Sequence, residues 1–316
     1  MLARYWGKRR EKTIHWWDYR RRELDAWLDA DRNRTNGQAT VSLRQLGRLG
    51  RFGNWLFQYM FLKCYAAKNG LRSETPHWPG HQLFDCNDPL LSTHFPRCAE
   101  SDAVTLLKQP QAITNVDLVG YFQLHTSHYA PYQEYIREVL PPHPRLHPKL
   151  IQGFQPLAKA GRTLVALHVR RGDFGEDQFY ITPTSWYRDW LTQVWPTLND
   201  PVLYVASEEP DKILQDFSDF HPWPSRDLKV CLPQAPYFTD FYVLTRAQVL
   251  AIPNSTFSFA AAMLNRACQV YRSHLSDPLE SPPFRRIDPW NSSVLDRQAR
   301  VEHFPEIPGI RRAHVA

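Results

Sequence analysis

The chain has 316 residues, enough for two ordinary domains, and its 43% hydrophobic and 22% charged residues are typical of a globular protein with a real core. The formal net charge of +6 favours anionic partners without choosing among phosphates, nucleic acid and membrane surfaces. The five cysteines are scattered and show no CxxC spacing, which argues against a disulfide framework and a zinc cluster and favours a reducing compartment.

The first 40 residues form a separate zone in which basic side chains alternate with Trp and Tyr. A charged helix is predicted over 13–30 and a polar linker over 33–40. Such an arm suits a peripheral contact with an anionic membrane surface, and it suits equally a solvated helix packed on the main body. No apolar run reaches the length of a membrane span, so a cytoplasmic protein, soluble or membrane-peripheral, is expected.

An N-terminal α/β domain is predicted over 41–150. Its expected elements are a strand over 41–46, a glycine-rich turn over 48–53, a helix over 54–69, a strand over 116–122 and a helix over 127–140. Gly70 is expected to end the first helix in a left-handed conformation. The segment 73–110 gives few periodic signals. The proline-rich run 141–148 cannot continue a helix and marks the predicted domain boundary.

Short apolar runs alternate with helical segments over 151–275. The predicted strands cover 163–169, 202–206, 228–232, 248–252 and 268–271, and the predicted helices cover 183–195, 207–217, 236–246 and 256–265. This alternation is typical of a Rossmann-like parallel sheet with helices on both faces. Such sheets bind ligands beyond the carboxyl ends of their strands. A Pro- and Arg-rich extension follows over 276–316.

Two arginines lie at the predicted carboxyl end of the strand 163–169, within the sequence HVRRGD (168–173). A guanidinium pairs with a phosphate through two parallel hydrogen bonds and stays charged at every physiological pH. Beside a departing nucleoside diphosphate, that charge would stabilise the transition state. The alternative is a structural pair between an arginine and Asp173 that closes the strand end, and position and charge alone favour neither.

Two further segments could approach an anion. The segment 253–259 lies between a predicted strand and a predicted helix, where hydroxyls and free N–H groups form an anion site. The alternative is an ordinary Ser/Thr helix cap, which the segment taken by itself favours. Gly47, Gly50 and Gly53 precede the helix that begins at Asn54, and glycines let the backbone approach a phosphate closely. Their spacing is neither the dinucleotide-binding fingerprint nor a Walker loop.

Four segments together resemble a known family. HVRRGDF (168–174) resembles the HxRRxD motif of the α-1,2-, α-1,6- and protein O-fucosyltransferases. GRFGNWLFQY (50–59) and GYFQ (120–123) resemble the GxLGNQxFQY and GYxQ segments of the α-1,2-fucosyltransferases. The segment 240–264 resembles the DxxLMxxCxxxIxSNSSFSWWAAxL block of the same family. The order and spacing of the four segments also agree with that family.

The resemblance implies an α/β fold of the GT-B type, with two Rossmann-like domains and the site for the sugar donor in the cleft between them. It implies an inverting glycosyltransferase that uses neither metal nor cofactor. The expected reaction moves L-fucose from GDP-fucose to a hydroxyl of a glycan acceptor, with galactose O2 as the expected position. Nucleic acid is not an expected partner.

Residues at matching positions take roles from the resemblance. Arg170 would bind the diphosphate and stabilise the leaving group, with Arg171 beside it, and His168 and Asp240 would contact the guanine. The other substrate-binding residues that the resemblance implies are Gly53, Asn54, Gln123, Ser255, Thr256, Phe257 and Ser258.

The acceptor hydroxyl needs a group that accepts its proton. Asp173, Glu176 and Asp177 lie within or just after the arginine motif and are candidates for that base, with plain solvation of these acidic side chains as the alternative. The predicted catalytic residues are therefore Arg170, Asp173 and Glu176.

The chain departs from the family pattern at two places. Trp55 stands where the family has Gln, and Phe259-Ala260 replaces a Trp-rich pair. The alternatives are therefore another sugar donor or a protein acceptor on the same fold. A third alternative is a non-catalytic protein that binds nucleic acid or membrane through its basic arm.

Metal ligands are not indicated by the sequence. Asp29-Ala30-Asp31 matches the DxD pattern by which some glycosyltransferases hold a divalent metal, but it falls within the predicted N-terminal helix, before the first strand. The 13 histidines show no HExxH spacing. We therefore expect no metal in the reaction.

Overall fold

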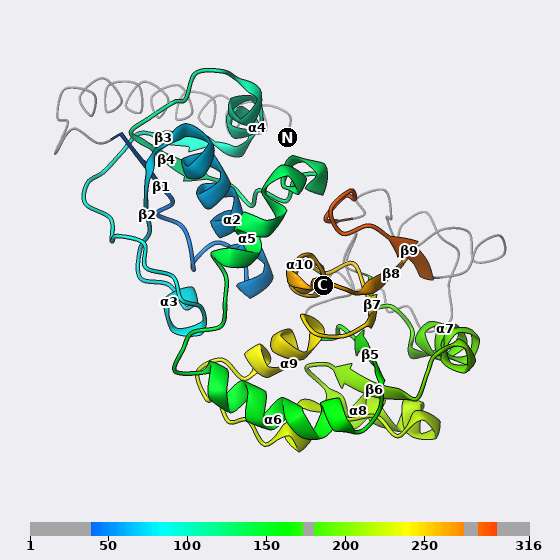
Figure 1. Cartoon of the computed structure of the whole chain (residues 1–316). Coiled ribbons are helices and arrows are strands. Elements are labelled where there is room, and N and C mark those ends of the chain that lie inside the picture. The colour runs from blue at the N-terminus through cyan, green and yellow to red at the C-terminus, as the bar shows by residue number, and fades with distance from the viewer. Residues whose placement is uncertain (1–38, 173–179, 275–283, 296–316) are drawn as a thin grey trace, which may run out of the picture. The chain divides into compact units, whose positions relative to one another are not determined.

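The computed structural model describes residues 39–172, 180–274 and 284–295, which form two compact units (Figure 1). The first unit comprises the described residues up to Arg51, together with Phe57–Pro79 and Asn87–Phe122. The second unit comprises Phe52–Leu56, Gly80–Cys86 and the described residues from Gln123 onward. The predicted arm, apart from its last two residues, and most of the extension over 276–316 lie outside the described residues.

The first unit contains a parallel sheet of four strands in the order β2-β1-β4-β3. These strands are β1 (Thr40–Ser42), β2 (Arg72–Glu74), β3 (Arg97–Ala99) and β4 (Val116–Val119). The sequence predicted β1 and β4, with β1 shorter than expected. It missed β2 and β3 because three residues are too few to show an alternation of apolar and polar side chains.

Helix α2 (Phe52–Asn69) is the longest described helix, and its sequence is apolar on nearly every side. Buried residues such as Phe57, Met60, Phe61 and Tyr65 line successive turns of it, as expected for a helix that is covered all round. Its end confirms the prediction, because Gly70 has φ 62° and its left-handed conformation satisfies the last carbonyl groups.

The second unit contains a five-stranded sheet in the order β6-β5-β7-β8-β9. Its parallel strands are β5 (Thr163–His168), β6 (Pro201–Ala206), β7 (Val249–Ile252) and β8 (Gln269–Ser273). The antiparallel strand β9 (Phe284–Ile287) completes one edge. The parallel Rossmann-like core is as predicted, whereas β9 falls in the extension over 276–316, where the sequence predicted no strand.

The strand predicted over 228–232 is wrong. A 3₁₀ turn, η5 (Ser225–Leu228), leads to Lys229, whose φ of 54° is left-handed and incompatible with a strand. The edge of the sheet beside β6 is taken instead by Trp223, whose N–H donates to Leu203 O (2.9 Å). Val205 N in turn donates to Trp223 O (3.0 Å), so the position next to β6 is already filled.

Helices cover both faces of this second sheet (Figure 1). Val165 and Leu167 of β5 pack into one apolar core with Tyr187 and Leu191 of α7 (Thr184–Val194) and Phe217 of η4 (Leu214–Phe220). The alternate side chains of β5 face the other way. That second face is covered by α6 (His147–Lys159), α9 (Tyr237–Leu244) and α10 (Thr256–Leu264).

The remaining described helices are short. They are α3 (Gly80–Leu83), α4 (Glu100–Lys108), η1 (Thr126–His128), η2 (Ala130–Tyr132), α5 (Gln133–Glu138), η3 (Trp195–Thr197) and α8 (Pro210–Ile213). The helix predicted over 127–140 is thus divided into η1, η2 and α5, with Pro131 in the middle of η2. The boundary predicted at residue 150 falls inside α6, because proline is tolerated in the first turn of a helix.

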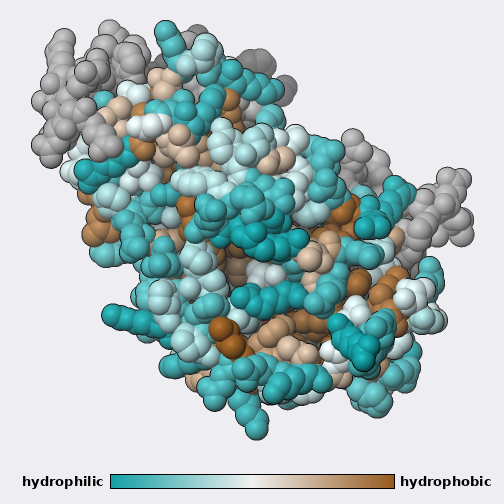
Figure 2. All heavy atoms as spheres, in the orientation of Figure 1, coloured by the Kyte–Doolittle hydropathy of each residue, from teal (hydrophilic) through white to brown (hydrophobic). Residues whose placement is uncertain are grey.

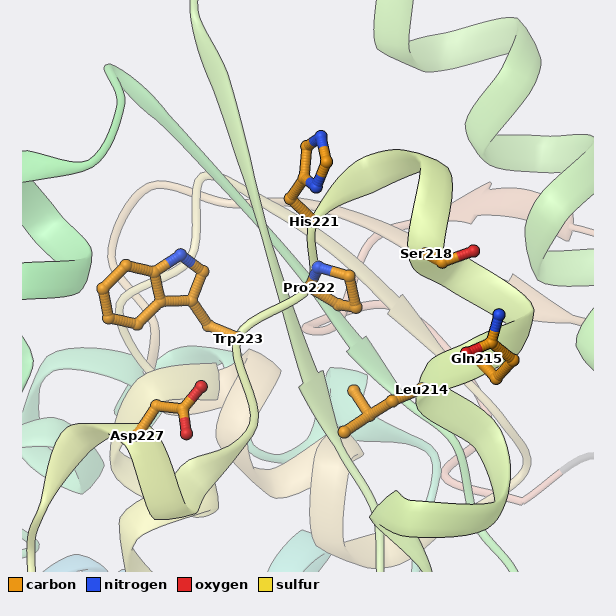
Figure 3. Close-up of a pocket in the computed structure, with 7 residues that line it drawn as sticks. All are labelled: Leu214, Gln215, Ser218, His221, Pro222, Trp223 and Asp227. Atoms are coloured by element: carbon orange, nitrogen blue, oxygen red, sulfur yellow. The ribbon is translucent and has the colours of Figure 1, made fainter.

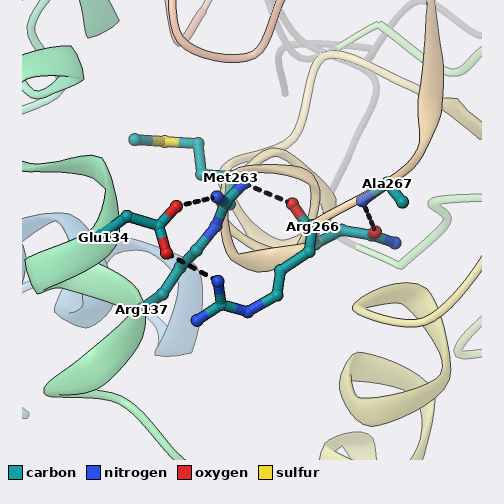
Figure 4. A network of polar contacts seen from close by, with 6 residues as sticks. Glu134, Arg137, Met263, Arg266 and Ala267 are labelled. Carbon is teal, nitrogen blue, oxygen red and sulfur yellow. Dashed lines mark hydrogen bonds and ion pairs between the residues drawn. The ribbon is translucent and has the colours of Figure 1, made fainter.

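A cationic side chain closes the carboxyl end of α10 (Figure 4). The Arg137 guanidinium donates to Met263 O (3.3 Å) and Asn265 O (2.6 Å), where helix carbonyls lack partners in the next turn. Glu134 pairs with both Arg137 and Arg266, at 2.6 Å each. These bonds tie α10 to α5, both in the second unit.

Hydrophilic side chains cover most of the face drawn in Figure 2. Among the described residues, the exposed large apolar side chains are Leu90, Tyr121 and Ile151, which lie on separate elements. None of the described helices is both long enough and apolar enough to cross a membrane.

Candidate functional site

Two helix N-termini meet in the second unit. Gly53 lies in the first turn of α2, and a Cβ atom at that position would stand 2.5 Å from Phe257 N and 2.7 Å from Thr256 Oγ1, in the first turn of α10. No side chain fits into that space, so glycine is required for this approach. The first N–H groups of each helix lack partners within their helix and carry partial positive charge. Their convergence produces a place that favours an anion.

Aromatic rings hold the two helix starts together. The Phe52 ring lies 4.9 Å from Tyr237, 5.1 Å from Phe241 and 6.0 Å from Phe257, measured between centroids. Phe241 and Phe257 also meet edge to face, at 5.5 Å. This apolar cluster joins α2, α9 and α10 and makes the approach at Gly53 a fixed feature of the unit.

Asn54 joins three predicted site residues in one hydrogen-bonded group. Its Oδ1 accepts from Gln123 Nε2 (2.8 Å) and from Thr256 Oγ1 (2.9 Å), although Thr256 lies 202 residues away in the chain. Two donors on one oxygen fix the orientation of the amide. Among the residues that the structure describes, none accepts from Asn54 Nδ2, which therefore remains a donor for a ligand.

Helix α10 begins without the ordinary cap that the sequence left as an alternative. Ser255 occupies the N-cap position in an extended conformation, but its side chain makes no capping hydrogen bond. The Thr256 hydroxyl is directed to Asn54 instead. The first-turn N–H groups of α10 are therefore not capped by the Ser255 side chain, and N–H groups at a helix start favour an anion.

His168 anchors the carboxyl end of β5 to α10. The side chain is 3% exposed, and its Nδ1 lies 2.8 Å from the Ser258 hydroxyl, which is fully buried. Burial, with a smaller contribution from the Arg170 charge, lowers the pKa of His168 to about 3. The imidazole is thus neutral at physiological pH. The Tyr187 hydroxyl donates to His168 O (2.8 Å) and holds the backbone from the opposite face.

The two arginines after β5 have different partners. The Arg171 guanidinium donates to the carbonyl groups of Arg170 (2.8 Å) and Thr182 (3.1 Å), which is a structural arrangement. The Arg170 guanidinium pairs with the Glu208 carboxylate, and Arg171 N donates to Glu208 Oε2 (3.2 Å). Glu208 follows the carboxyl end of β6, the strand next to β5, and the sequence analysis missed it. Its signal was an acidic residue just beyond a predicted strand.

Asp240 lies in the first turn of α9, on the same face of the sheet as His168. Its Oδ1 accepts from the hydroxyl of Tyr204 in β6 (2.6 Å). Burial raises the pKa of Asp240 to about 7, against the opposing effect of hydrogen bonds from Tyr204 and Ser225. A carboxyl group that titrates near neutrality is an unusual feature and marks a candidate for ligand contact.

The second unit therefore contains every described residue among the predicted site residues. Gly53, Asn54, Gln123, Thr256 and Phe257 meet at the helix starts, and Ser258 joins them to His168. Asp173 and Glu176, predicted as catalytic, lie outside the described residues, as does Asp177. Within the described ranges, no three His, Cys, Asp or Glu side chains converge as metal ligands would.

A separate hollow of about 640 Å³ lies beside the edge of the same sheet (Figure 3). Its lining residues come from η4 and the chain that follows it, and they are Leu214, Gln215, Ser218, His221, Pro222, Trp223 and Asp227. None of the predicted site residues lines this hollow. The groups that suit an anion are at the helix starts and at the end of β5.

No protein-family model matches the chain, and no curated protein sequence matches it. Solved structures do. The α-1,6-fucosyltransferase NodZ of Bradyrhizobium, soaked with GDP-fucose, superposes with a TM-score of 0.55 at 13% identity, over 79% of this chain and 99% of NodZ. A variant of FUT1 from Arabidopsis thaliana in complex with GDP gives a TM-score of 0.57 at 13% identity, over 93% of this chain and 85% of that one. At such identities the likeness shows the fold, and the chain has the two Rossmann-like α/β units of the GT-B type, as the sequence predicted.

Proposed function

We propose that the chain is a glycosyltransferase that moves L-fucose from GDP-fucose to a hydroxyl of a glycan acceptor. The observation that carries this proposal is the meeting of the N-termini of α2 and α10 at Gly53. The contact between His168 and Ser258 joins α10 to the end of β5, and Arg170 follows that end. Backbone N–H groups and a guanidinium together suit a diphosphate. The similar structures of NodZ and FUT1 were solved with GDP-fucose and with GDP, which supports the same nucleotide for this chain.

In this proposal the protein acts on the leaving group. As the bond from fucose to the diphosphate breaks, negative charge grows on the distal phosphate. Once the diphosphate is bound, Arg170 and the N–H groups at the starts of α2 and α10 stabilise that charge without further reorganisation. The Asn54 Nδ2 group, held in place by Gln123 and Thr256, is a further donor to the phosphates or the sugar.

The guanine is assigned to His168 and Asp240 by the family resemblance. The N1–H and amino group of guanine are hydrogen-bond donors, so an ionised Asp240 would accept from them, whereas adenine offers no equivalent pair. The Tyr204 hydroxyl holds the Asp240 carboxylate from one side. Preference for GDP over other nucleotides follows from that arrangement.

The finer features of the reaction come from the resemblance in the sequence. Attack by the acceptor on the side opposite the diphosphate would invert the anomeric configuration, with Asp173 or Glu176 as the base that takes the acceptor proton. Galactose O2 is the proposed acceptor position, and the reaction is proposed to use no metal. A cytoplasmic location and a membrane contact through the basic arm remain predictions from composition.

A different GDP-sugar is the second candidate donor, and Trp55 favours it. Trp55 lies in the first turn of α2 beside Asn54, and its buried Nε1–H has no hydrogen-bond partner among the described residues. An indole at the position of an amide alters the shape and the hydrogen bonding offered to a sugar. Turnover of a panel of GDP-sugars by the purified protein distinguishes the two donors.

Calorimetric titration with GDP, UDP, CMP and ADP in the presence of EDTA tests the proposal. GDP is expected to bind, and the other three nucleotides to bind at least about tenfold more weakly, since each lost hydrogen bond to a charged group costs about 1.5–3 kcal/mol. Equal binding of all four nucleotides would contradict the proposed contacts with guanine. Binding of GDP only after a divalent metal is added would contradict the metal-independent mechanism.

A further inference from the structure

The Arg170 guanidinium is a charge that needs a partner. Its side chain is 13% exposed, and a cation this far from water is costly unless an anion lies beside it. Among the residues that the structure describes, the Glu208 carboxylate is such an anion. The proposed function assigns the Arg170 guanidinium to the diphosphate. Glu208 is therefore paired with the same guanidinium that the ligand would use.

Glu208 binds as a phosphate would. Strands β5 and β6 are parallel neighbours in which His168 pairs with Ala206, so their carboxyl ends stand side by side. One carboxylate oxygen of Glu208 meets the Arg170 guanidinium, and the other accepts from Arg171 N at 3.2 Å. A guanidinium and a backbone N–H are both typical phosphate donors.

Glu208 is also free to leave. Its side chain is 37% exposed and lies in the connection between β6 and α8. If it turned outward, its carboxylate would be solvated, and a phosphate in its place would keep Arg170 neutralised. One anion would replace another, so no charge would be left unpaired at any stage.

We propose that Glu208 is an internal anion, which pairs with Arg170 in the ligand-free protein and is displaced from it when a nucleoside diphosphate binds. The inference rests on the proposed function, because it takes the Arg170 guanidinium as the diphosphate site. It makes Glu208 a competitor of the ligand and at the same time a stabiliser of the empty protein.

Glu208→Gln tests this dual role, with Glu209→Gln as the matched control. Glu209 is the next residue, and its carboxylate pairs with Lys212 at 2.9 Å. Calorimetry is expected to show that Glu208→Gln binds GDP more tightly than the wild type, by on the order of tenfold, because a competing charge is gone. Without GDP the same variant is expected to melt at a lower temperature than the wild type, and GDP is expected to raise its Tm by more.

The two variants separate competition from a general change in charge. Glu209→Gln removes the same charge one residue away, so it is expected to change the Kd for GDP by less than about twofold. In an Arg170→Ala background, Glu208→Gln is expected to add no tightening beyond that of the control, because the residue it competes for is absent.

Weaker or unchanged GDP binding by Glu208→Gln would overturn the inference, and so would an equal tightening by Glu209→Gln. Both results presuppose that the wild type binds GDP. Failure of the wild-type titration would instead contradict the proposed function, so the two failures are distinguishable.

Discussion

At the scale of single residues, neighbouring side chains of the same type differ in what they do. Arg170 and Arg171 are adjacent, yet one guanidinium faces a carboxylate and the other faces backbone carbonyl groups. Both arginines follow the carboxyl end of β5 at His168, where the chain is no longer part of a strand. Charge alone therefore does not distinguish a ligand-binding arginine from a structural one.

Arg170→Lys is expected to lose most GDP affinity, by at least about tenfold, although it keeps the charge. A single ammonium group cannot reproduce the two parallel hydrogen bonds of a guanidinium. Calorimetry with GDP measures the loss. Arg171→Lys is the control. It is expected to lower the Tm, and to lower GDP affinity less than Arg170→Lys does. If Arg170→Lys bound GDP with wild-type affinity, the proposal that Arg170 binds the diphosphate would be wrong.

Asp240 is expected to make GDP binding depend on pH. Its folded pKa of about 7 lies above its usual value, so the carboxyl group is largely protonated below neutrality and cannot accept from guanine. GDP affinity should rise roughly tenfold from about pH 6 to about pH 8, as one proton is released. Calorimetry across that range measures the rise.

Two variants check the assignment of that titration. Asp240→Asn is expected to bind GDP weakly at every pH, and Tyr204→Phe is expected to shift the rise to higher pH because it removes a hydrogen bond that lowers the pKa. The pH dependence of stability has the opposite sign to that of GDP affinity. Between about pH 4 and 7 the unfolded chain releases a proton that native Asp240 retains, so the wild type should lose stability relative to Asp240→Asn as the pH rises. A flat affinity profile in the wild type would contradict the assignment.

At the scale of elements, the proposed nucleotide site depends on how closely two helix starts approach. Two of the three atoms that a Cβ at Gly53 would meet, Phe257 N and Thr256 C, belong to the backbone of α10, which cannot turn aside as a flexible side chain could. Arg137 and Glu134 hold the opposite end of α10, so that helix has little freedom to move away. The anion site is therefore a property of helix packing rather than of any one loop.

Gly53→Ala is expected to weaken GDP binding by about tenfold or more and to destabilise the protein by about 1–3 kcal/mol, as overpacked sites do. Gly70→Ala is the control, because a Cβ there meets nothing within 4 Å although φ is 62°. It should cost stability, about 1 kcal/mol, and leave GDP affinity unchanged. Calorimetry and denaturant unfolding measure both effects. Normal GDP binding by a folded Gly53→Ala protein would contradict the proposal that the helix starts bind the nucleotide.

At the scale of the whole molecule, the fold resembles that of solved structures with which the chain shares few identical residues. NodZ superposes over 99% of its own length at 13% identity. A fold of this kind supports many reactions, so the assignment of a nucleotide depends on the residues at the strand ends and helix starts. In this chain those residues all belong to the second unit, whose parallel sheet aligns the carboxyl ends of β5 and β6.

Local patterns in the sequence predict most strands and helices of the second unit, apart from the wrong strand over 228–232 and the missed β9. They also predict the left-handed end of α2 at Gly70 and the place of Arg170 beyond a buried strand. These features depend on local periodicity and local backbone preferences, which neighbouring residues express. Only the tertiary structure decided which side chains meet across long stretches of chain. Thr256 donates a hydrogen bond to Asn54, Tyr204 donates one to Asp240, and Arg170 pairs with Glu208. Trp223 lies at the sheet edge, where a strand over 228–232 was predicted. Such pairs are fixed by the packing of helices against the sheet, and no local pattern in the sequence records them.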